Sequence, residues 1–281
     1  MIEHSRIRRA LPHVFLWLAI IVIVFPIYVT FVASTHANED VLSAPMPLNF
    51  GHQFFENYHR ALTQGTRALG ASSLTMSKNS LIMALGISFG KIVISLMVAF
   101  AIVFFDFRLR KVCFWSIFIT LMLPVEVRLM PTYKVISDLH MLNTYQGLIL
   151  PMVVSATAVF LFRQFFMQIP REIAEASQID GASPMSFFYH VLAPMTRTPI
   201  AAIFVIQFIY GWNQYLWPLL ITTKEQFYTL FIGINKLIAG TDTNIEWNIG
   251  MATTMLAMIP PVIVVILMQE QFVAGMTDTE K

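Results

Sequence analysis

Long apolar runs alternate with short polar segments along this chain. Six of the runs hold few or no charges and are long enough for a bilayer-spanning helix, which needs about 20 residues. They cover residues 14–33, 80–105, 112–131, 142–162, 198–223 and 247–269. The pattern predicts an all-α polytopic membrane protein with six transmembrane helices.

The first apolar run follows Arg6, Arg8 and Arg9 and therefore has the flanks of a secretion signal. Its apolar core is 20 residues long and contains Pro26, whereas a signal core usually has about 7–15 residues. We therefore expect this run to remain in the protein as a membrane anchor.

Basic residues predict the orientation of the chain. If the N-terminus is cytoplasmic, ten Lys and Arg residues lie on the inner side, in residues 1–13, 106–111, 163–197 and 270–281. Six lie in the outer loops, which are longer in total and cover residues 34–79, 132–141 and 224–246. The excess of basic residues on the inner side favours cytoplasmic termini.

This orientation divides the chain into three parts. A cytoplasmic tail of residues 1–13 precedes a membrane domain of residues 14–269, and residues 270–281 form a second cytoplasmic tail. The first outer loop is long, and we expect short helices in it.

Composition supports lipid as the main solvent and excludes several functions. Hydrophobic residues make up 57% of the chain and charged residues 12%, with 24 Phe and 17 Met. The net charge is only +2, with no basic stripe of the kind that binds nucleic acid. The seven histidines show no paired spacing that indicates a metal site, and the single cysteine, Cys113, is expected to be a passive apolar residue.

Catalytic motifs are not apparent in the sequence. Residues Gly86 to Lys91 superficially resemble a phosphate-binding loop, but the glycine spacing is one residue short. Ile92 also stands where that loop needs Ser or Thr. We therefore expect no enzymatic activity and no cofactor in this chain.

Three ionisable residues fall inside the predicted spans, namely Lys91, Glu126 and Arg128. Each costs at least about 2.5–3.5 kcal/mol to insert, so such groups normally face a cavity or a partner. They either neutralise one another and pack helices, or line a polar path in which the two cations meet an anionic substrate. A spacing of two residues puts Glu126 and Arg128 on different helix faces, so they need not pair.

The fifth predicted span contains Trp212, Asn213, Gln214, Tyr215 and Trp217. Aromatic residues near the end of a span usually mark the membrane interface, and this interpretation suits Trp217. Asn213 and Gln214 fit it less well, because amides beside aromatic rings also suit a sugar- or polyol-sized ligand. Both interpretations remain open.

A polar segment, residues 170–194, is the longest charged interruption in the second half of the chain. Pro170 suits the first position of a helix, and Gly181 suits the left-handed residue that ends one. Ser183 and Pro184 suit the N-cap and first turn of a second helix, expected to end at about Leu192. The sequence thus predicts a helix, a sharp turn and a helix between the fourth and fifth spans, facing the cytoplasm.

The spacing within this segment resembles the EAA loop of ABC importer permeases: Glu175-Ala176-Ser177, three residues, Gly181, nine residues, then Val191-Leu192-Ala193-Pro194. The family pattern is EAA, three residues, Gly, nine residues and I-x-L-P. This chain has Ser177 in place of the third-position Ala, Val191 in place of Ile and Ala193 in place of Leu. These changes keep the helix, the turn and the proline.

Other runs extend the resemblance over almost the whole chain. The FLFRQFFMQIP and IDGASP runs are similar to the carbohydrate-uptake branch of the family. The MLPVEVR run of the third span is most similar to the second permease subunit of sn-glycerol-3-phosphate importers. The implied substrate is sn-glycerol-3-phosphate or a glycerophosphodiester. Neutral sugars or polyols are the alternative, and an ion-driven secondary transporter or a membrane scaffold is a more distant one.

The resemblance also implies partners and site residues. Such permeases form a heterodimer in the bacterial inner membrane, with an ATPase dimer that binds ATP and Mg²⁺ and an external substrate-binding protein. Within the EAA loop, residues 168–197, the residues implied to couple to the ATPase are Glu175, Ala176, Ser177, Asp180, Gly181 and Pro194. Glu175 would be the docking acid. The predicted substrate path contains Lys91, Glu126, Arg128, Trp212, Asn213 and Tyr215.

Overall fold

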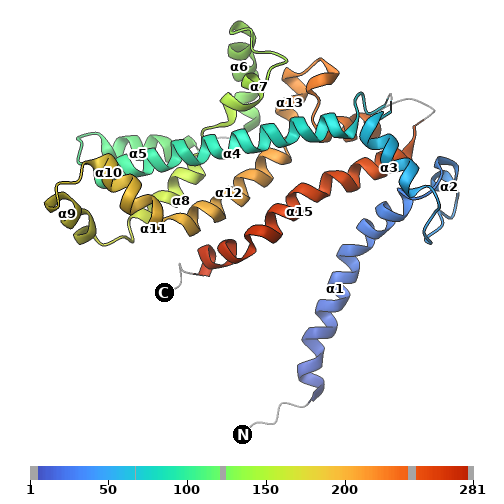
Figure 1. Cartoon of the computed structure of the whole chain (residues 1–281), viewed down its shortest axis with the longest axis horizontal. Helices are drawn as coiled ribbons and strands as arrows, with labels where there is room; N and C mark the ends of the chain where they lie inside the picture. The colour runs from blue at the N-terminus through green and yellow to red at the C-terminus, as the bar shows by residue number, and fades with distance from the viewer. Residues whose placement is uncertain (1–5, 67, 121–124, 240–244, 278–281) are drawn as a thin grey trace. The chain divides into compact units, whose positions relative to one another are not determined.

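The computed structural model describes residues 6–66, 68–120, 125–239 and 245–277 (Figure 1). Regular secondary structure in these residues is helical, with no strand among them, which confirms the predicted all-α class. The chain folds as two compact units. The small unit combines Met1–Leu74 with Gly233–Ile259, and the large unit combines Thr75–Ile232 with Pro260–Lys281.

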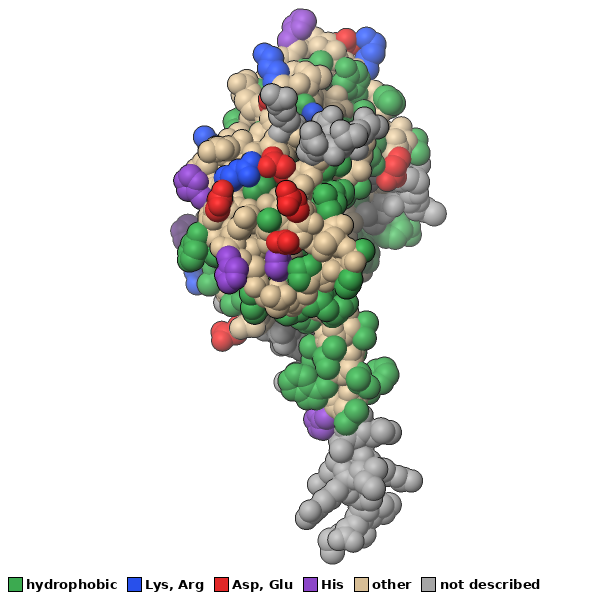
Figure 2. Space-filling model, turned by 90° about the vertical axis from the view of Figure 1, so that its right-hand side faces the viewer, with side chains coloured by type: hydrophobic (Ala, Val, Ile, Leu, Met, Phe, Trp, Pro, Cys, Tyr) green, Lys and Arg blue, Asp and Glu red, His purple; other side chains and the backbone are tan. Residues whose placement is uncertain are grey.

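Helix α1, Arg6–Ala33, is the first helix of the small unit. Its residues Pro12–Ala33 form a candidate span whose most apolar stretch is not buried against the rest of the chain. Figure 2 shows hydrophobic side chains crowded along this helix. An apolar helix that does not pack on its own chain must find its apolar partner elsewhere, and lipid fits that requirement.

Two short helices follow α1 in the small unit, α2 (Asn38–Leu42) and α3 (Phe54–Thr63). The predicted short helices of this loop are therefore confirmed. Asn57 of α3 is 1% exposed, and its amide nitrogen donates to the carbonyl oxygens of Ser34, at 2.9 Å, and His36, at 2.8 Å. Its side-chain oxygen accepts from the amide of Asn248 at 3.0 Å. One buried amide thus joins three segments of the unit.

Further polar contacts fasten the same unit. Asn38 donates to the carbonyl oxygen of Ile245 at 3.0 Å and accepts from the backbone N–H of Trp247 at 2.7 Å. Arg60 and Glu246 form a half-buried ion pair at 2.6 Å. Burial raises the pKa of the Tyr58 phenol, although its hydrogen bond with Ser34 opposes that shift.

Helix α4, Ser73–Phe104, is the longest helix and begins in the small unit but lies mainly in the large one. It covers the predicted span 80–105 except for its last residue, and it starts earlier than predicted. Ser73, at its first position, is buried and hydrogen-bonds to the hydroxyl of Thr253 at 2.7 Å. Hydropathy alone misses such a polar first turn because tertiary contacts hold it.

The predicted fourth span is divided, and the described part of the third comprises two helices. The third is covered by α5 (Arg110–Ile119) and α6 (Val125–Asp138), with residues 121–124 outside the described ones. The fourth is covered by α7 (Tyr145–Ile149), a 3-10 turn (Leu150–Met152) and α8 (Ala156–Phe166). The pair Tyr145–Met152 and Ala156–Phe166 is bent by 48°. Pro151 lies in the 3-10 turn that precedes this bend.

The polar segment and the fifth predicted span follow. They comprise α9 (Arg171–Ile179), α10 (Pro184–Phe187), a π-helical turn (Phe188–Leu192), α11 (Ala193–Met195), α12 (Arg197–Trp212) and α13 (Leu216–Ile221). A 3-10 turn (Glu225–Phe227), α14 (Leu230–Ala239) and α15 (Trp247–Thr277) complete the described helices.

Candidate membrane spans number three among the described residues, or up to five if each bent helix pair is one span. The three single helices are Pro12–Ala33, Ser73–Phe104 and Trp247–Glu270. The second bent pair joins Pro184–Met195 to Arg197–Trp212 at 75°. An apolar membrane protein is thus supported, while the count of six spans stays a prediction.

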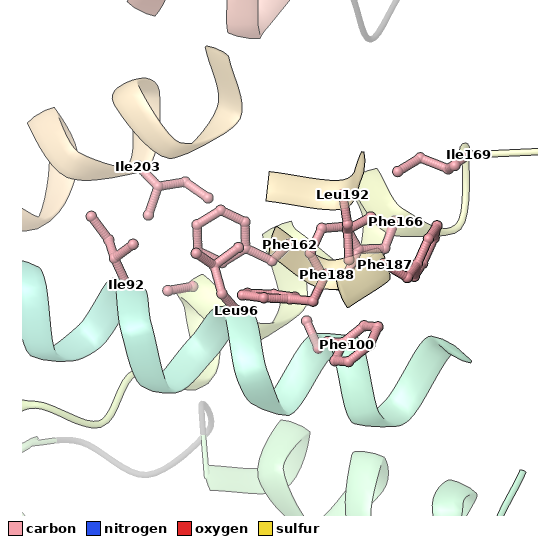
Figure 3. Close-up of a cluster of buried hydrophobic side chains, with 12 residues drawn as sticks. Ile92, Leu96, Phe100, Phe162, Phe166, Ile169, Phe187, Phe188, Leu192 and Ile203 are labelled. Carbon is pink, nitrogen blue, oxygen red and sulfur yellow. The ribbon is translucent and has the colours of Figure 1, made fainter. Parts of the chain in front are cut away.

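A cluster of aromatic and aliphatic side chains forms the core of one end of the large unit. We call it the phenylalanine cluster and define it by its buried rings, Phe100, Phe162, Phe166, Phe187 and Phe188. Figure 3 shows Phe100 of α4 directed toward Phe188, with Phe162 beside them. Segments far apart in sequence therefore meet through ring packing.

A second apolar cluster lies in the same unit and joins α4, α7 and α13. Trp217 is 1% exposed within it and donates its indole N–H to the carbonyl oxygen of Gly147 at 3.1 Å. Trp217 is therefore packed inside the protein, and its depth relative to the membrane interface stays a prediction. Its N–H is satisfied inside the protein by this hydrogen bond. Gly147 also packs closely on the loop before α7, where an added Cβ would lie only 2.2 Å from the carbonyl oxygen of Met141.

Candidate functional site

The polar segment, residues 170–194, has the predicted helix, turn and helix, and we call it the coupling segment. Helix α9 ends in a Schellman motif, in which the N–H of Ala182 donates to Ser177 and the N–H of Gly181 donates to Gln178, both at 3.0 Å. Gly181 has φ +77°, a left-handed conformation that favours glycine. The predicted role of Gly181 in the turn is confirmed.

The second helix of the coupling segment begins as predicted. The Ser183 hydroxyl caps it by accepting from the N–H of Ser186 at 3.2 Å, and Pro184 follows in the first turn. The expected end near Leu192 is wrong, because helical structure continues to Met195. The π-helical turn changes the register before Pro194, which then stands in the first turn of α11, where its missing N–H costs no intrahelical bond.

Aromatic packing anchors the coupling segment to the spans. The ring centroid of Phe188 lies 5.1 Å from that of Phe100 in α4, and Phe187 lies 5.3 Å from Phe104. Ile173 and Ala174 of α9 pack against the same cluster. A displacement of this segment would therefore be passed to α4, α8 and α12 through a packed core of low compressibility.

One face of α9 remains exposed. Glu172, Glu175, Ala176 and Ile179 share it at helical spacing, and Ile179 is 86% exposed. Ser177 is half-buried, whereas Asp180 and Pro194 are exposed. The face combines two carboxylates with an apolar residue that has no apolar cover in this chain, as a docking surface would.

Lys91 is buried in the large unit, at 5% exposure. Its ammonium donates to the side-chain oxygen of Gln207 at 3.0 Å and lies 3.5 Å from the ring centroid of Tyr210. Gln207 and Tyr210 are one turn apart on α12, so one face of that helix satisfies the charge through a hydrogen bond and a cation–π contact.

Glu126 and Arg128 lie near the start of α6, and both side chains are exposed. Among the described residues, no ion pair joins them. The structure therefore gives no sign of the mutual neutralisation considered from the sequence. The preceding Leu123 and Pro124 of this run lie outside the described residues.

Residues 213–215 form the break between α12 and α13, and Trp212 is the last residue of α12. Trp212 is 2% exposed, and its ring stacks on Phe208 at 6.0 Å between centroids. Asn213 is exposed at the C-cap of α12, and Tyr215 is half-buried. Of the predicted aromatic and amide ligand groups, Asn213 and Tyr215 are reachable, whereas Trp212 is packed in the core.

Sequence inspection missed Gln207 and Tyr210. The signal available for Gln207 was a lone amide in the uncharged run 198–223, but its partner Lys91 is 116 residues away. Within the described residues no group of three His, Cys, Asp or Glu side chains could hold a metal ion.

Comparison with known proteins places this chain in a family. Residues 91–278 match the family described as binding-protein-dependent transport system inner membrane component. The chain belongs to this family of ABC importer permeases, which are transport components rather than enzymes.

Among individual proteins, the chain is similar to the sn-glycerol-3-phosphate transport system permease protein UgpE of Rhizobium meliloti, with 53% identity over 282 residues and 100% of both chains covered. The UgpE protein of an Escherichia coli strain is 51% identical over 281 residues, again with 100% of both chains covered.

A solved structure shares the fold. The crystal structure of a bacterial ABC transporter involved in the import of the acidic polysaccharide alginate matches with a TM-score of 0.83. The alignment covers 97% of this chain and 99% of that chain at 20% identity. At that identity the match supports the fold alone.

Proposed function

We propose that this chain is one permease subunit of an ATP-driven importer for sn-glycerol-3-phosphate or glycerophosphodiesters. The observation that carries the proposal is the identity of 50–53% over the full length with permeases named for sn-glycerol-3-phosphate transport. The chain would form half of a translocation path with a second permease, while an ATPase dimer binds ATP and Mg²⁺ and an external binding protein delivers the substrate.

The coupling segment is proposed to receive the ATPase. Glu175 on the exposed face of α9 would pair with a basic group in the ATPase, and Ile179 would bury its exposed side chain there. Ala176 permits close approach on the same face. Asp180 and Gly181 shape the turn, and Pro194 shapes the helical segment that follows it. Ser177 is the half-buried residue of α9 in this set.

The substrate path is proposed to include the exposed groups of the broken spans. Arg128 would meet the phosphate, since its charge has no ion-pair partner among the described residues. Glu126, Asn213 and Tyr215 would contact the glycerol part or the partner permease. Lys91 and Trp212, which are buried, would act behind the path by charge and by packing.

The proposed topology keeps six spans, with both termini and the coupling segment in the cytoplasm. In this arrangement the small unit's loops and residues 224–246 face outward, where the binding protein docks. Accessibility of single introduced cysteines in intact cells tests it: labelling of residue 179 by an impermeant reagent would overturn the orientation.

Uptake assays test the substrate. Cells that lack their own importer and express this chain with its partner permease, ATPase and binding protein should accumulate labelled sn-glycerol-3-phosphate. Arg128→Met should lower uptake strongly. Lys134→Met is the matched control, because Lys134 is an exposed cation on the same helix with an ion-pair partner in Asp138. Unaltered uptake in Arg128→Met would remove the anion-path assignment.

Retention of the ATPase tests coupling. Glu175→Lys should cause loss of the ATPase during purification of the complex, because it reverses the docking charge. Glu56→Lys, an exposed acid of α3, is the control and should retain the ATPase. Normal uptake without any ATPase would instead indicate a secondary transporter driven by an ion gradient.

One observation favours neutral sugars or polyols as a second candidate. The ammonium of Lys91 is already engaged by Gln207 and Tyr210, as expected for a charge that packs helices. The two candidates differ in competition assays: excess glycerol phosphate should block uptake in the first, and excess neutral sugar or polyol in the second.

A further inference from the structure

A pocket in the large unit lies beside the phenylalanine cluster and shares Arg171 with the coupling segment, but most of its charged lining has no role in the sites described above. The end of α4, the start of α5, the end of α8 and the start of α9 line it. These helices lie together at one end of α4 (Figure 1). We call it the basic pocket and define it by its four cations, Arg110, Lys111, Arg163 and Arg171, with Phe114 and Trp115.

The charges of the basic pocket are largely uncompensated. Arg110 forms an ion pair with Asp106 at 2.9 Å, but that carboxylate is 97% exposed. Among the described residues, no ion pair within 4.0 Å involves Lys111, Arg163 or Arg171. Like charges held this close repel one another, so an anion in the pocket would stabilise the arrangement.

Arg163 carries a more specific sign of a missing ligand. Its guanidinium lies 4.1 Å from the ring centroid of Phe114, which fixes its plane. Its Nε is buried and has no hydrogen-bond partner in the described part of the chain. A buried N–H without an acceptor is costly, and a phosphate oxygen is the acceptor that a guanidinium binds best.

The other wall of the basic pocket continues onto an apolar surface. Trp115 is exposed and shares one stripe of α5 with Val112 and Ile119, which are also exposed. In the predicted third span, this stripe would face hydrocarbon. A ligand that fills the pocket and follows this stripe needs an anionic phosphate group and an acyl chain.

We propose that the basic pocket binds the phosphate headgroup of an anionic glycerophospholipid from the inner leaflet, with an acyl chain along the α5 stripe. Basic pockets between transmembrane helices on the cytoplasmic side are suited to such headgroups. The proposal rests on the orientation given under the proposed function, which places α9 in the cytoplasm. A soluble phosphate ester shares the headgroup chemistry but would leave the apolar stripe unused.

Lipid binding to the purified permease–ATPase complex, measured by native mass spectrometry, tests the proposal. Titration with phosphatidylglycerol should give more bound lipid than titration with phosphatidylcholine. The double variant Lys111→Gln/Arg163→Gln should bind phosphatidylglycerol at least about tenfold more weakly, because each basic residue near the membrane contributes to anionic lipid affinity.

A control variant and a competitor separate the outcomes. Arg197→Gln/Lys134→Gln removes the same charge outside the basic pocket and should bind phosphatidylglycerol as the unaltered chain does. Arg163→Lys should lose part of the affinity, which keeps the test meaningful if the double variant folds poorly. Equal binding in the pocket variant and the control would overturn the proposal, as would displacement of the lipid by inorganic phosphate at matched concentrations.

Lipid binding is measured without transport, so the lipid site and the proposed function can fail separately. If the complex binds phosphatidylglycerol through the pocket but does not import sn-glycerol-3-phosphate, the substrate assignment fails and the lipid site stands. If uptake is normal and pocket variants retain lipid, the lipid site alone fails.

Discussion

One end of the large unit and the loop region of the small unit are stabilised by different kinds of interaction. The phenylalanine cluster of the large unit is packed from rings that contribute no directional bonds. The small unit instead depends on a buried amide, Asn57, that makes three hydrogen bonds to segments far apart in sequence. Truncating a buried ring destabilises the fold by leaving a cavity, whereas replacing a buried amide by an apolar group destabilises it by leaving hydrogen-bond partners unsatisfied. These interactions fit the proposed functions, since the packed core would transmit displacement of the coupling segment and the loop region of the small unit would keep one shape.

The largest expected effect comes from removing a ring from the phenylalanine cluster. Phe162 is fully buried, so Phe162→Ala should lower the free energy of unfolding by about 3–5 kcal/mol through lost burial and a cavity. Phe55→Ala is the control, because Phe55 is 85% exposed, and it should change stability by no more than about 0.5 kcal/mol. Thermal unfolding of the purified chain measures both. Similar destabilisation by the two variants would contradict the packed core.

The amide network around Asn57 can be disrupted by a substitution that does not reduce side-chain volume. Asn57→Leu keeps the size of the side chain but leaves two carbonyl oxygens and the Asn248 amide without their partner, which should cost roughly 2–3 kcal/mol. Asn49→Leu, at an exposed side chain, is the matched control. Faster proteolysis of the first loop in Asn57→Leu alone would support the network. Equal proteolysis in both variants would argue against it.

A substitution in the turn of the coupling segment should have the next largest effect. Gly181→Ala places a Cβ in a left-handed backbone, which costs about 1–2 kcal/mol, although no atom lies within 4 Å of that Cβ. The change should loosen α9 and reduce substrate-stimulated ATP hydrolysis while leaving assembly intact. Ala182→Gly, the neighbouring position, controls for general flexibility. Full hydrolysis in Gly181→Ala would show that the turn geometry is not needed for coupling.

The sequence predicted features that local chemistry determines. Hydropathy located α1, α4 and α15, and the Gly181 and Ser183 signals located the turn and cap of the coupling segment. These depend on residues close in sequence, where propensity and capping act.

The features that sequence inspection missed depend on contacts between distant residues. Nothing near Trp217 shows that its N–H reaches Gly147, and nothing near Lys91 shows that Gln207 receives its ammonium. The end of the coupling segment was also misplaced: a π-helical turn, in which Phe188 and Leu192 are buried among distant residues, precedes Pro194, and helical structure continues beyond it. Long-range partners override a local helix-stop signal.

The smallest expected effect sharpens the comparison between the two units. Leu96 lies in the phenylalanine cluster at 8% exposure, and Leu96→Met conserves volume and polarity, so stability should fall by less than about 1.5 kcal/mol. Leu96→Asn has a similar size but buries an amide without a partner, and it should cost clearly more. Thermal unfolding of both variants, beside Asn57→Leu, checks the contrast. If Leu96→Met lowers stability as much as Leu96→Asn, side-chain shape rather than polarity determines the stability of this end of the large unit. The distinction between the two units then fails.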